Sequence, residues 1–178
     1  KTFLDQMGRS VQLVNWPPRR IISLVPSQTE FLADLGLDQE VVGITKFCLH
    51  PTDWFQNKQW VGGTKTLNSQ KIEALKPDLI LGNKEENERS QIESLAERYP
   101  VWMSDIYTLE DALDMMRRFG ELTGKTEKAN TIADEIDSGF TQHLSLHTQH
   151  LKVAYLIWRK PYMVAGTGTF IDNMLQHA

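Results

Sequence analysis

The sequence has little cysteine, few clustered basic residues and no long apolar run. One cysteine, Cys48, excludes a disulfide within the 178-residue chain and says little about its compartment. The formal net charge is −4 and no run of four basic residues occurs, so we expect no nucleic-acid partner. No apolar stretch approaches the ~20 residues of a membrane-spanning helix.

Glycine-rich nucleotide motifs are also missing. Neither G-x-G-x-x-G nor G-x-x-x-x-G-K-[ST] occurs, and the glycines at 166–169 come too late after their strand to form such a motif. The chain shows no assembled set of acid, base and nucleophile, because Cys48 and His50 are near neighbours that need not meet. We therefore do not expect an enzyme.

The first part of the chain instead shows a repeated strand–helix rhythm after a small hairpin or extended arm at 2–14. Strands are predicted at 20–25, 41–44, 60–62, 78–82 and 101–103, and helices at 27–35, 69–75 and 88–98. Strands that alternate with helices indicate an α/β fold with a parallel sheet. We assign residues 1–107 to this N-terminal lobe.

Two helices follow, and then a new strand. Apolar spacing predicts helices at 108–123 and 126–147, the second about 33 Å long at the α-helical rise per residue. A strand at 153–157 and a helix at 170–177 come next. We expect a helical segment at 108–150 and the beginning of a second lobe at 151–178. One strand and one helix cannot bury their own apolar faces, which favours a fragment of a longer protein over an addition to the first lobe.

The segment from Arg20 to Glu30 is the most informative stretch. A buried-strand run ends at Pro26, and Ser27 and Glu30 match the capping-box pattern S-x-x-E, so the helix is predicted to begin at Ser27. A glutamate that accepts hydrogen bonds from the helix amides would leave this helix end poorly suited to bind a phosphate group. The turn lies at the carboxyl end of a strand, which is where open parallel sheets bind ligands.

Polar and aromatic residues follow the other predicted strands as well. The candidate ligand-binding residues are Ser27, Phe47, His50, Thr64, Lys65, Asn83, Lys84, Trp158, Arg159 and Tyr162. Cations around aromatic walls suit a bulky anionic ligand. The alternative is that lysine and arginine are simply common in loops.

No metal site can be completed from the sequence. His50 is the candidate ligand if a metal binds, but with Cys48 it supplies too few donors for a zinc or manganese site. His143, His147 and His150 are spaced so that the first two can share a helix face; a solvated helix end is the preferred interpretation.

Several motifs resemble one family. The segments at 5–11, 18–30, 35–36, 61–63, 72–80 and 155–161 are similar to periplasmic substrate-binding proteins for iron-siderophores and vitamin B12, the ABC-importer receptors with a helical backbone. The similarity covers essentially the whole chain, and its most specific parts are the strand with PS-x-TE and the ALKPDLI segment.

The resemblance implies two α/β lobes joined by one long helix, with the ligand between them and most of the second lobe lacking here. It implies capture of a metal chelate (a ferric siderophore, haem or a corrinoid) outside the inner membrane and delivery to an ABC permease, without catalysis or an intrinsic cofactor. We expect a periplasmic or otherwise extracytoplasmic monomer whose leader is absent from this chain, and only small closure of the cleft.

The chain also departs from the family pattern. Of four loop positions that are aromatic in vitamin B12 receptors, Phe47 and Trp158 are aromatic here, whereas Thr64 and Asn83 are not, and the nearby lysines favour an anionic iron chelate. The family's acidic permease-docking position is Gln70 here, and Glu73, one helical turn on, is the nearest carboxylate. The alternatives are a binding protein for free transition-metal ions that uses His50, or a Rossmann-like enzyme.

Overall fold

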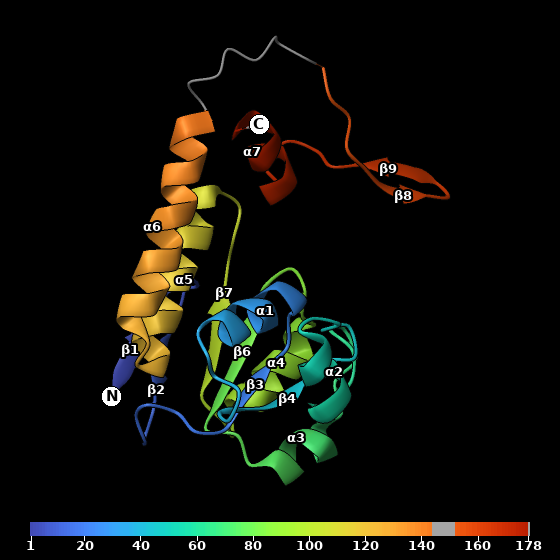
Figure 1. The fold of residues 1–178 in the computed structure, drawn as a ribbon. Coiled ribbons are helices and arrows are strands. Elements are labelled where there is room, and N and C mark those ends of the chain that lie inside the picture. Colours follow the sequence, from blue (N-terminus) through green and yellow to red (C-terminus); the bar gives the residue numbers. More distant parts are fainter. Residues whose placement is uncertain (144–151, 178) are drawn as a thin grey trace.

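A five-stranded parallel sheet forms the centre of the N-terminal lobe (Figure 1). The computed structural model describes residues 1–143 and 152–177. The sheet has the order β5-β4-β3-β6-β7, and every neighbouring pair is parallel. Its strands are β3 (Ile21–Ser23), β4 (Val41–Ile44), β5 (Gln59–Trp60), β6 (Leu79–Asn83) and β7 (Val101–Ser104). The prediction of an α/β fold with a parallel sheet is therefore confirmed.

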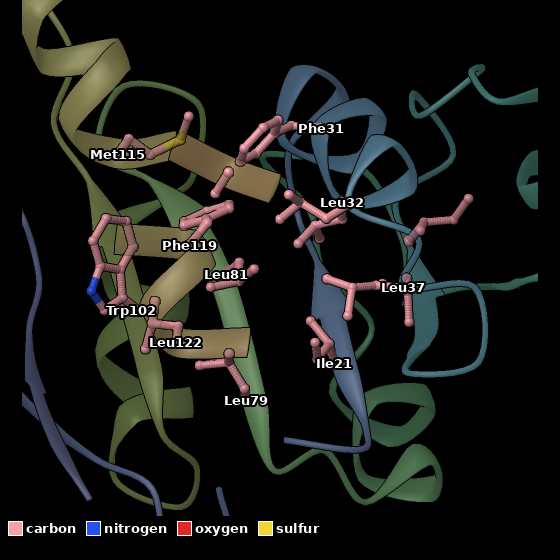
Figure 2. Close-up of a cluster of buried hydrophobic side chains, with 14 of the residues drawn as sticks. Ile21, Phe31, Leu32, Leu37, Leu79, Leu81, Trp102, Met115, Phe119 and Leu122 are labelled. Atoms are coloured by element: carbon pink, nitrogen blue, oxygen red, sulfur yellow. The ribbon is translucent and has the colours of Figure 1, made fainter. Parts of the chain in front are cut away.

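Helices cover both faces of this sheet, because its strands are apolar on both sides. On one face, alternate strand residues such as Leu79, Leu81 and Trp102 pack against α1 (Pro26–Asp34) and α5 (Leu109–Thr123), as Figure 2 shows. On the other face, the intervening residues pack against α3 (Ser69–Leu75) and α4 (Arg89–Ala96). Successive side chains of a strand point to opposite faces of the sheet, and this alternation divides the core into these two halves.

The start of α1 differs from the prediction. The N-cap is Val25, no side chain caps the helix, and Pro26 occupies the first helical turn. Ser27 and Glu30 are exposed helical residues, so the predicted capping box is wrong. A proline at the first helical position has its φ already set for a helix and lacks the N–H that would need a cap. The helix ends before Gly36, whose φ of 75° suits glycine.

The helices α5 and α6 (Thr126–His143) pack side by side (Figure 1). Thr108 and Asp111 form a capping box at the start of α5, and Gly124 ends it in the left-handed conformation. Gly120 permits close approach, because a Cβ there would lie 2.4 Å from Cβ of Ala129. Both helices were predicted. Residues 144–147 of the second predicted helix and His150 lie outside the described residues. His143 lies in α6, but nothing is described of its side chain.

The two ends of the chain form smaller units. The antiparallel hairpin of β1 (Thr2–Leu4) and β2 (Ser10–Gln12) confirms one predicted form of the N-terminal arm. The helix α2 (Thr52–Asn57) and the strand β9 (Tyr162–Val164) were not predicted. The predicted strand at 153–157 is observed as β8 (Leu156–Arg159), which pairs antiparallel with β9.

The helix α7 (Phe170–His177) was predicted and rests on α5. The amide of Leu109 donates to Oδ1 of Asn173 at 2.9 Å, and Met174 packs against the cluster of Leu109 and Leu113. All residues of β8 and β9 are exposed, and Figure 1 draws this hairpin apart from the five-stranded sheet. Within the described ranges, no helix has the length and apolar character needed to span a membrane.

Candidate functional site

The strand order reverses between β3 and β6, which places a crevice at their carboxyl ends. The chain leaves β3 toward β4 and β5, and then returns to add β6 and β7 on the other side. Open parallel sheets bind ligands at such a switch point, because the loops diverge there. A pocket of about 330 Å³ lies at this point. It is lined by Val25, Ser27, Gln28, Phe31, Asn83, Glu85, Glu86, Ile106, Ala112, Met115, Met116 and Phe170.

This pocket is apolar on most of its wall and acidic in part. The residues after β3 and β6 supply its polar groups, and α1, α5 and the start of α7 supply the apolar ones. Its charged residues in the described part of the chain are Glu85 and Glu86, so no cation lines it there. A concave apolar surface with a few polar groups is typical of small-molecule sites.

A buried polar network adjoins the pocket. Ser104 at the end of β7 receives hydrogen bonds from Nε2 of Gln28 at 2.7 Å and from Nδ2 of Asn83 at 2.9 Å. Oδ1 of Asn83 accepts from the amides of Glu85 and Glu86. Oδ1 of Asn87 accepts from the amide of Asn83 at 2.8 Å. These bonds fix the loop after β6, and with it one wall of the pocket.

Of the predicted ligand-binding residues, Ser27 and Asn83 line this pocket. The loop that carries Thr64 and Lys65 is held beside it, since Nδ2 of Asn87 donates to the carbonyl of Thr64 at 3.1 Å. Nζ of Lys65 donates to the carbonyl oxygen of Glu85. Ser27 and Asn83 therefore share one pocket, and Thr64 and Lys65 contact the segment that follows β6.

The cationic side chain of Lys84 is engaged within the lobe. Its Nζ lies 2.7 Å from Oδ2 of Asp105 and 3.3 Å from the hydroxyl of Tyr107. The hydrogen bond to Asp105, followed by that to Tyr107, raises the pKa of the Lys84 ammonium. The ammonium remains protonated, but Asp105 already neutralises its charge.

Phe47 and His50 follow β4 and are exposed. Phe47 lies over Gly63, where a Cβ would come within 3.0 Å of the ring, and Nζ of Lys46 lies 5.1 Å from the ring centroid. Cys48 is buried, with its Sγ 3.1 Å from Oγ1 of Thr29 and 3.2 Å from Oγ1 of Thr45. Among the described residues, no group of three potential metal-binding side chains is gathered around His50 or elsewhere.

The three predicted residues of the C-terminal part lie on the β8–β9 hairpin. Trp158 is 63% exposed and Tyr162 is 72% exposed, and Arg159 is paired with Tyr162 in the register of the hairpin. Figure 1 shows this hairpin apart from the strands β4 and β6. Their contact with a ligand stays a prediction.

The predicted docking residues lie on α3. Gln70 is exposed and lines a groove of about 510 Å³ together with Lys46, Gly63 and Asn68. Glu73 is exposed and forms an ion pair with Arg98, with 2.6 Å between Oε1 and Nη2. A permease residue that binds the Glu73 carboxylate would therefore compete with Arg98 for it.

Sequence reasoning missed Ser104 and the apolar wall, and Gln28, although it follows a predicted strand, was not among the predicted ligand-binding residues. A signal for Gln28 was present, because Gln28, Phe31, Leu32 and Leu35 follow the spacing of one helix face, and a polar residue on an apolar face needs a partner. Ser104 likewise ends an otherwise apolar strand. Met115 and Met116 gave no such signal, since methionines at this spacing fit an ordinary core.

Comparison with known proteins agrees with this architecture. Residues 21–178 match the family described as periplasmic binding protein. This is a class of ligand-binding α/β proteins, and the chain belongs to that family. The family resemblance and the fold class predicted from the sequence are thereby confirmed.

Individual relatives include proteins named for binding vitamin B12 or iron. A vitamin B12-binding protein of Pectobacterium atrosepticum is 28% identical over 166 residues, which are 89% of this chain and 59% of the relative. A possible iron-binding, periplasmic solute-binding protein of Staphylococcus epidermidis superposes with a TM-score of 0.75 at 27% identity, over 90% of this chain and 65% of the other. The periplasmic vitamin B12-binding protein of Vibrio cholerae superposes with a TM-score of 0.80 at 24% identity, over 90% and 64%. The chain thus spans about 60% of the length of such relatives.

Proposed function

We propose that this chain is part of the extracytoplasmic substrate-binding component of an ABC importer, which captures a metal chelate and delivers it to a permease. The observation that carries the proposal is the pocket at the switch point between β3 and β6, where an apolar wall meets a fixed polar loop. Membership of the periplasmic binding protein family supports it, as do relatives named for vitamin B12 and iron. A ferric siderophore, haem or a corrinoid is the proposed ligand class.

The proposal includes the division of the chain into lobes. Residues 1–107 form one wall of the cleft, 108–150 contain the helix that joins the lobes, and 151–178 begin the second lobe. Because β8 and β9 bury none of their residues, a second lobe would supply the apolar partner that they need. The protein would act as a monomer in the periplasm or on the outer side of the membrane.

Ligand titration tests this function. We expect cyanocobalamin, haemin or a ferric siderophore to quench the tryptophan fluorescence of the protein at the full length that its gene encodes, with saturation at one ligand per chain. Turnover of the ligand is not expected. Failure of all three chelate classes to bind, when added in the micromolar range, would contradict the proposal.

Docking to the permease is proposed to use the surface of α3 around Gln70 and Glu73. We expect Glu73→Ala to lower uptake of the bound chelate by cells, because Glu73 is an exposed carboxylate one helical turn from the neutral Gln70 on α3. Arg98→Ala should raise uptake by up to about fivefold, since a surface ion pair that competes for Glu73 contributes at most about 1 kcal/mol.

The matched control for this surface is Glu93→Ala. Glu93 is also exposed and also paired with an arginine, Arg89, at 2.7 Å, but it lies on α4. Its replacement should leave uptake unchanged. Equal uptake by the Glu73→Ala variant and the wild type would remove Glu73 from the docking surface.

A further inference from the structure

One face of α7 contacts earlier parts of the chain from the first residue of the helix to the last. The residues that make these contacts lie three or four positions apart and therefore share one helix face: Phe170, Asn173, Met174 and His177. Phe170 lines the pocket of about 330 Å³ at the switch point. His177 lies edge-on to Phe140 of α6, with 5.9 Å between the ring centroids. The helix thus packs beside α5 and α6 with a defined face turned toward them (Figure 1).

The centre of this contact is a hydrogen bond to the start of α5. The amide of Leu109, the first residue of α5, donates to Oδ1 of Asn173 at 2.9 Å. An amide in the first turn of a helix has no acceptor within its own helix. The capping box of Thr108 and Asp111 satisfies the amides of those two residues but not the amide of Leu109. Asn173 therefore caps α5 from a position 64 residues further along the chain.

The apolar part of the contact lies beside this bond. Met174 packs against the cluster that contains Leu109, Leu113 and Ala133. Apolar packing has little directional preference, so by itself it would let α7 slide or rotate on α5. A hydrogen bond requires a narrow range of distance and angle, so it fixes the position of Asn173. The bond to Leu109 therefore sets where α7 sits on α5.

Phe170 transmits this position to the pocket. It is the residue through which α7 lines the pocket, and at 36% exposure its ring is accessible to a ligand. The amide of Asp172 donates to Oγ1 of Thr169 at 3.2 Å, which caps the first turn of α7, where Phe170 lies. Asn173 is one helical turn from Phe170, so a displacement of one moves the other. An aromatic ring at this place offers a large apolar area to a bulky chelate.

We infer that Asn173 is a positioning residue of the pocket: its hydrogen bond to the start of α5 fixes α7 and thereby holds the ring of Phe170 against the bound ligand. Neither residue was among the ligand-binding residues predicted from the sequence. The inference rests on the proposed function, and it adds to that function an apolar ligand contact and the residue that keeps this contact in place.

Ligand dissociation tests the inference on the full-length protein. Stopped-flow tryptophan fluorescence would be recorded with cyanocobalamin, haemin or ferrioxamine B, whichever binds the wild type most tightly. We expect Asn173→Leu to raise the dissociation rate about fivefold, because it removes the acceptor for Leu109 at similar side-chain volume. Leucine also favours the helix more than asparagine does, so α7 should stay helical. Asn173→Asp keeps an oxygen acceptor and should restore most of the wild-type rate.

The matched control is Gln176→Leu, which makes the same kind of change at an exposed position of α7. It should leave the dissociation rate unchanged. A wild-type rate in Asn173→Leu, or an equal increase in Gln176→Leu, would overturn the inference while the proposed function stands.

A double-mutant cycle tests whether Asn173 acts through Phe170. Phe170→Ala removes the ring and should raise the dissociation rate at least about tenfold. Adding Asn173→Leu to Phe170→Ala should then change the rate by less than about twofold, because the ring that Asn173 positions is already gone. Effects that multiply in the double variant would show that Asn173 does not act through Phe170 and would overturn the inference.

Hydrogen exchange of the Leu109 amide tests the anchor without a ligand. We expect this amide to exchange about tenfold faster in Asn173→Leu than in the wild type, and to be protected again in Asn173→Asp. Equal exchange in the wild type and Asn173→Leu would overturn the anchor. Binding of none of the three chelates would overturn the proposed function and the role of Phe170 in it, while the exchange of Leu109 would still confirm or overturn the anchor.

Discussion

Replacing Phe119 by alanine is expected to lower the free energy of unfolding by about 4 kcal/mol, in the range for buried phenylalanines. Phe119 is fully buried and lies between the sheet and α1, as Figure 2 shows. Its ring centroid is 5.2 Å from that of Trp102 on β7, in an edge arrangement, and 6.3 Å from that of Phe31 on α1. Its removal would leave a cavity at the point where α5 joins the sheet.

The measurement is urea unfolding followed by tryptophan fluorescence, since Trp102 adjoins the mutated site. We expect a lower midpoint at an unchanged slope, which reports a change of stability and not of exposed surface. Phe47→Ala is the matched control. Phe47 is 51% exposed, so its removal should cost less than about 0.5 kcal/mol. Similar losses in the two variants would show that the α5–sheet contact is not central to stability.

Local patterns in the sequence predicted most of the elements but not how they meet. The alternation of apolar strands with amphipathic helices indicated a parallel sheet, and Gly36 and Gly124 indicated helix ends, because these are properties of neighbouring residues. The order of the strands depends on pairing between distant segments, so the switch point between β3 and β6 could not be located from the sequence. The capping box failed for a local reason, since Pro26 starts the helix one residue earlier than Ser27.

The electrostatics of the site could not be derived from residue types alone. Lys84 and Asp105 are 21 residues apart and follow adjacent strands, and only the parallel pairing of β6 with β7 brings their charges together. The ion pair of Lys84 within the lobe could therefore not be foreseen from its place after a strand. Gln28 and Ser104 are 76 residues apart, and their hydrogen bond exists for the same topological reason. The sequence shows which groups are present, and the sheet order decides which of them are satisfied within the protein.

Filling the pocket with a larger side chain is expected to abolish ligand binding. Ala112 lies on α5, is only partly buried and lines the pocket of about 330 Å³ opposite the loop after β6. In Ala112→Phe, the ring would occupy space that the ligand needs, so affinity should fall at least about a hundredfold, equivalent to about 2.7 kcal/mol. Stability should change little, because the added ring enters an existing pocket and does not displace packed side chains.

The matched control for Ala112→Phe is Ala96→Phe, which adds the same ring at an exposed position at the end of α4. Titration of both variants with the chelate that the wild type prefers, together with their urea midpoints, separates occlusion from misfolding. Loss of binding at an unchanged midpoint in Ala112→Phe alone locates the ligand between α1, α5 and the loop after β6. Wild-type affinity in Ala112→Phe would instead show that the ligand lies outside this pocket, nearer to Phe47 and the groove beside Gln70, because those residues are untouched by the added ring.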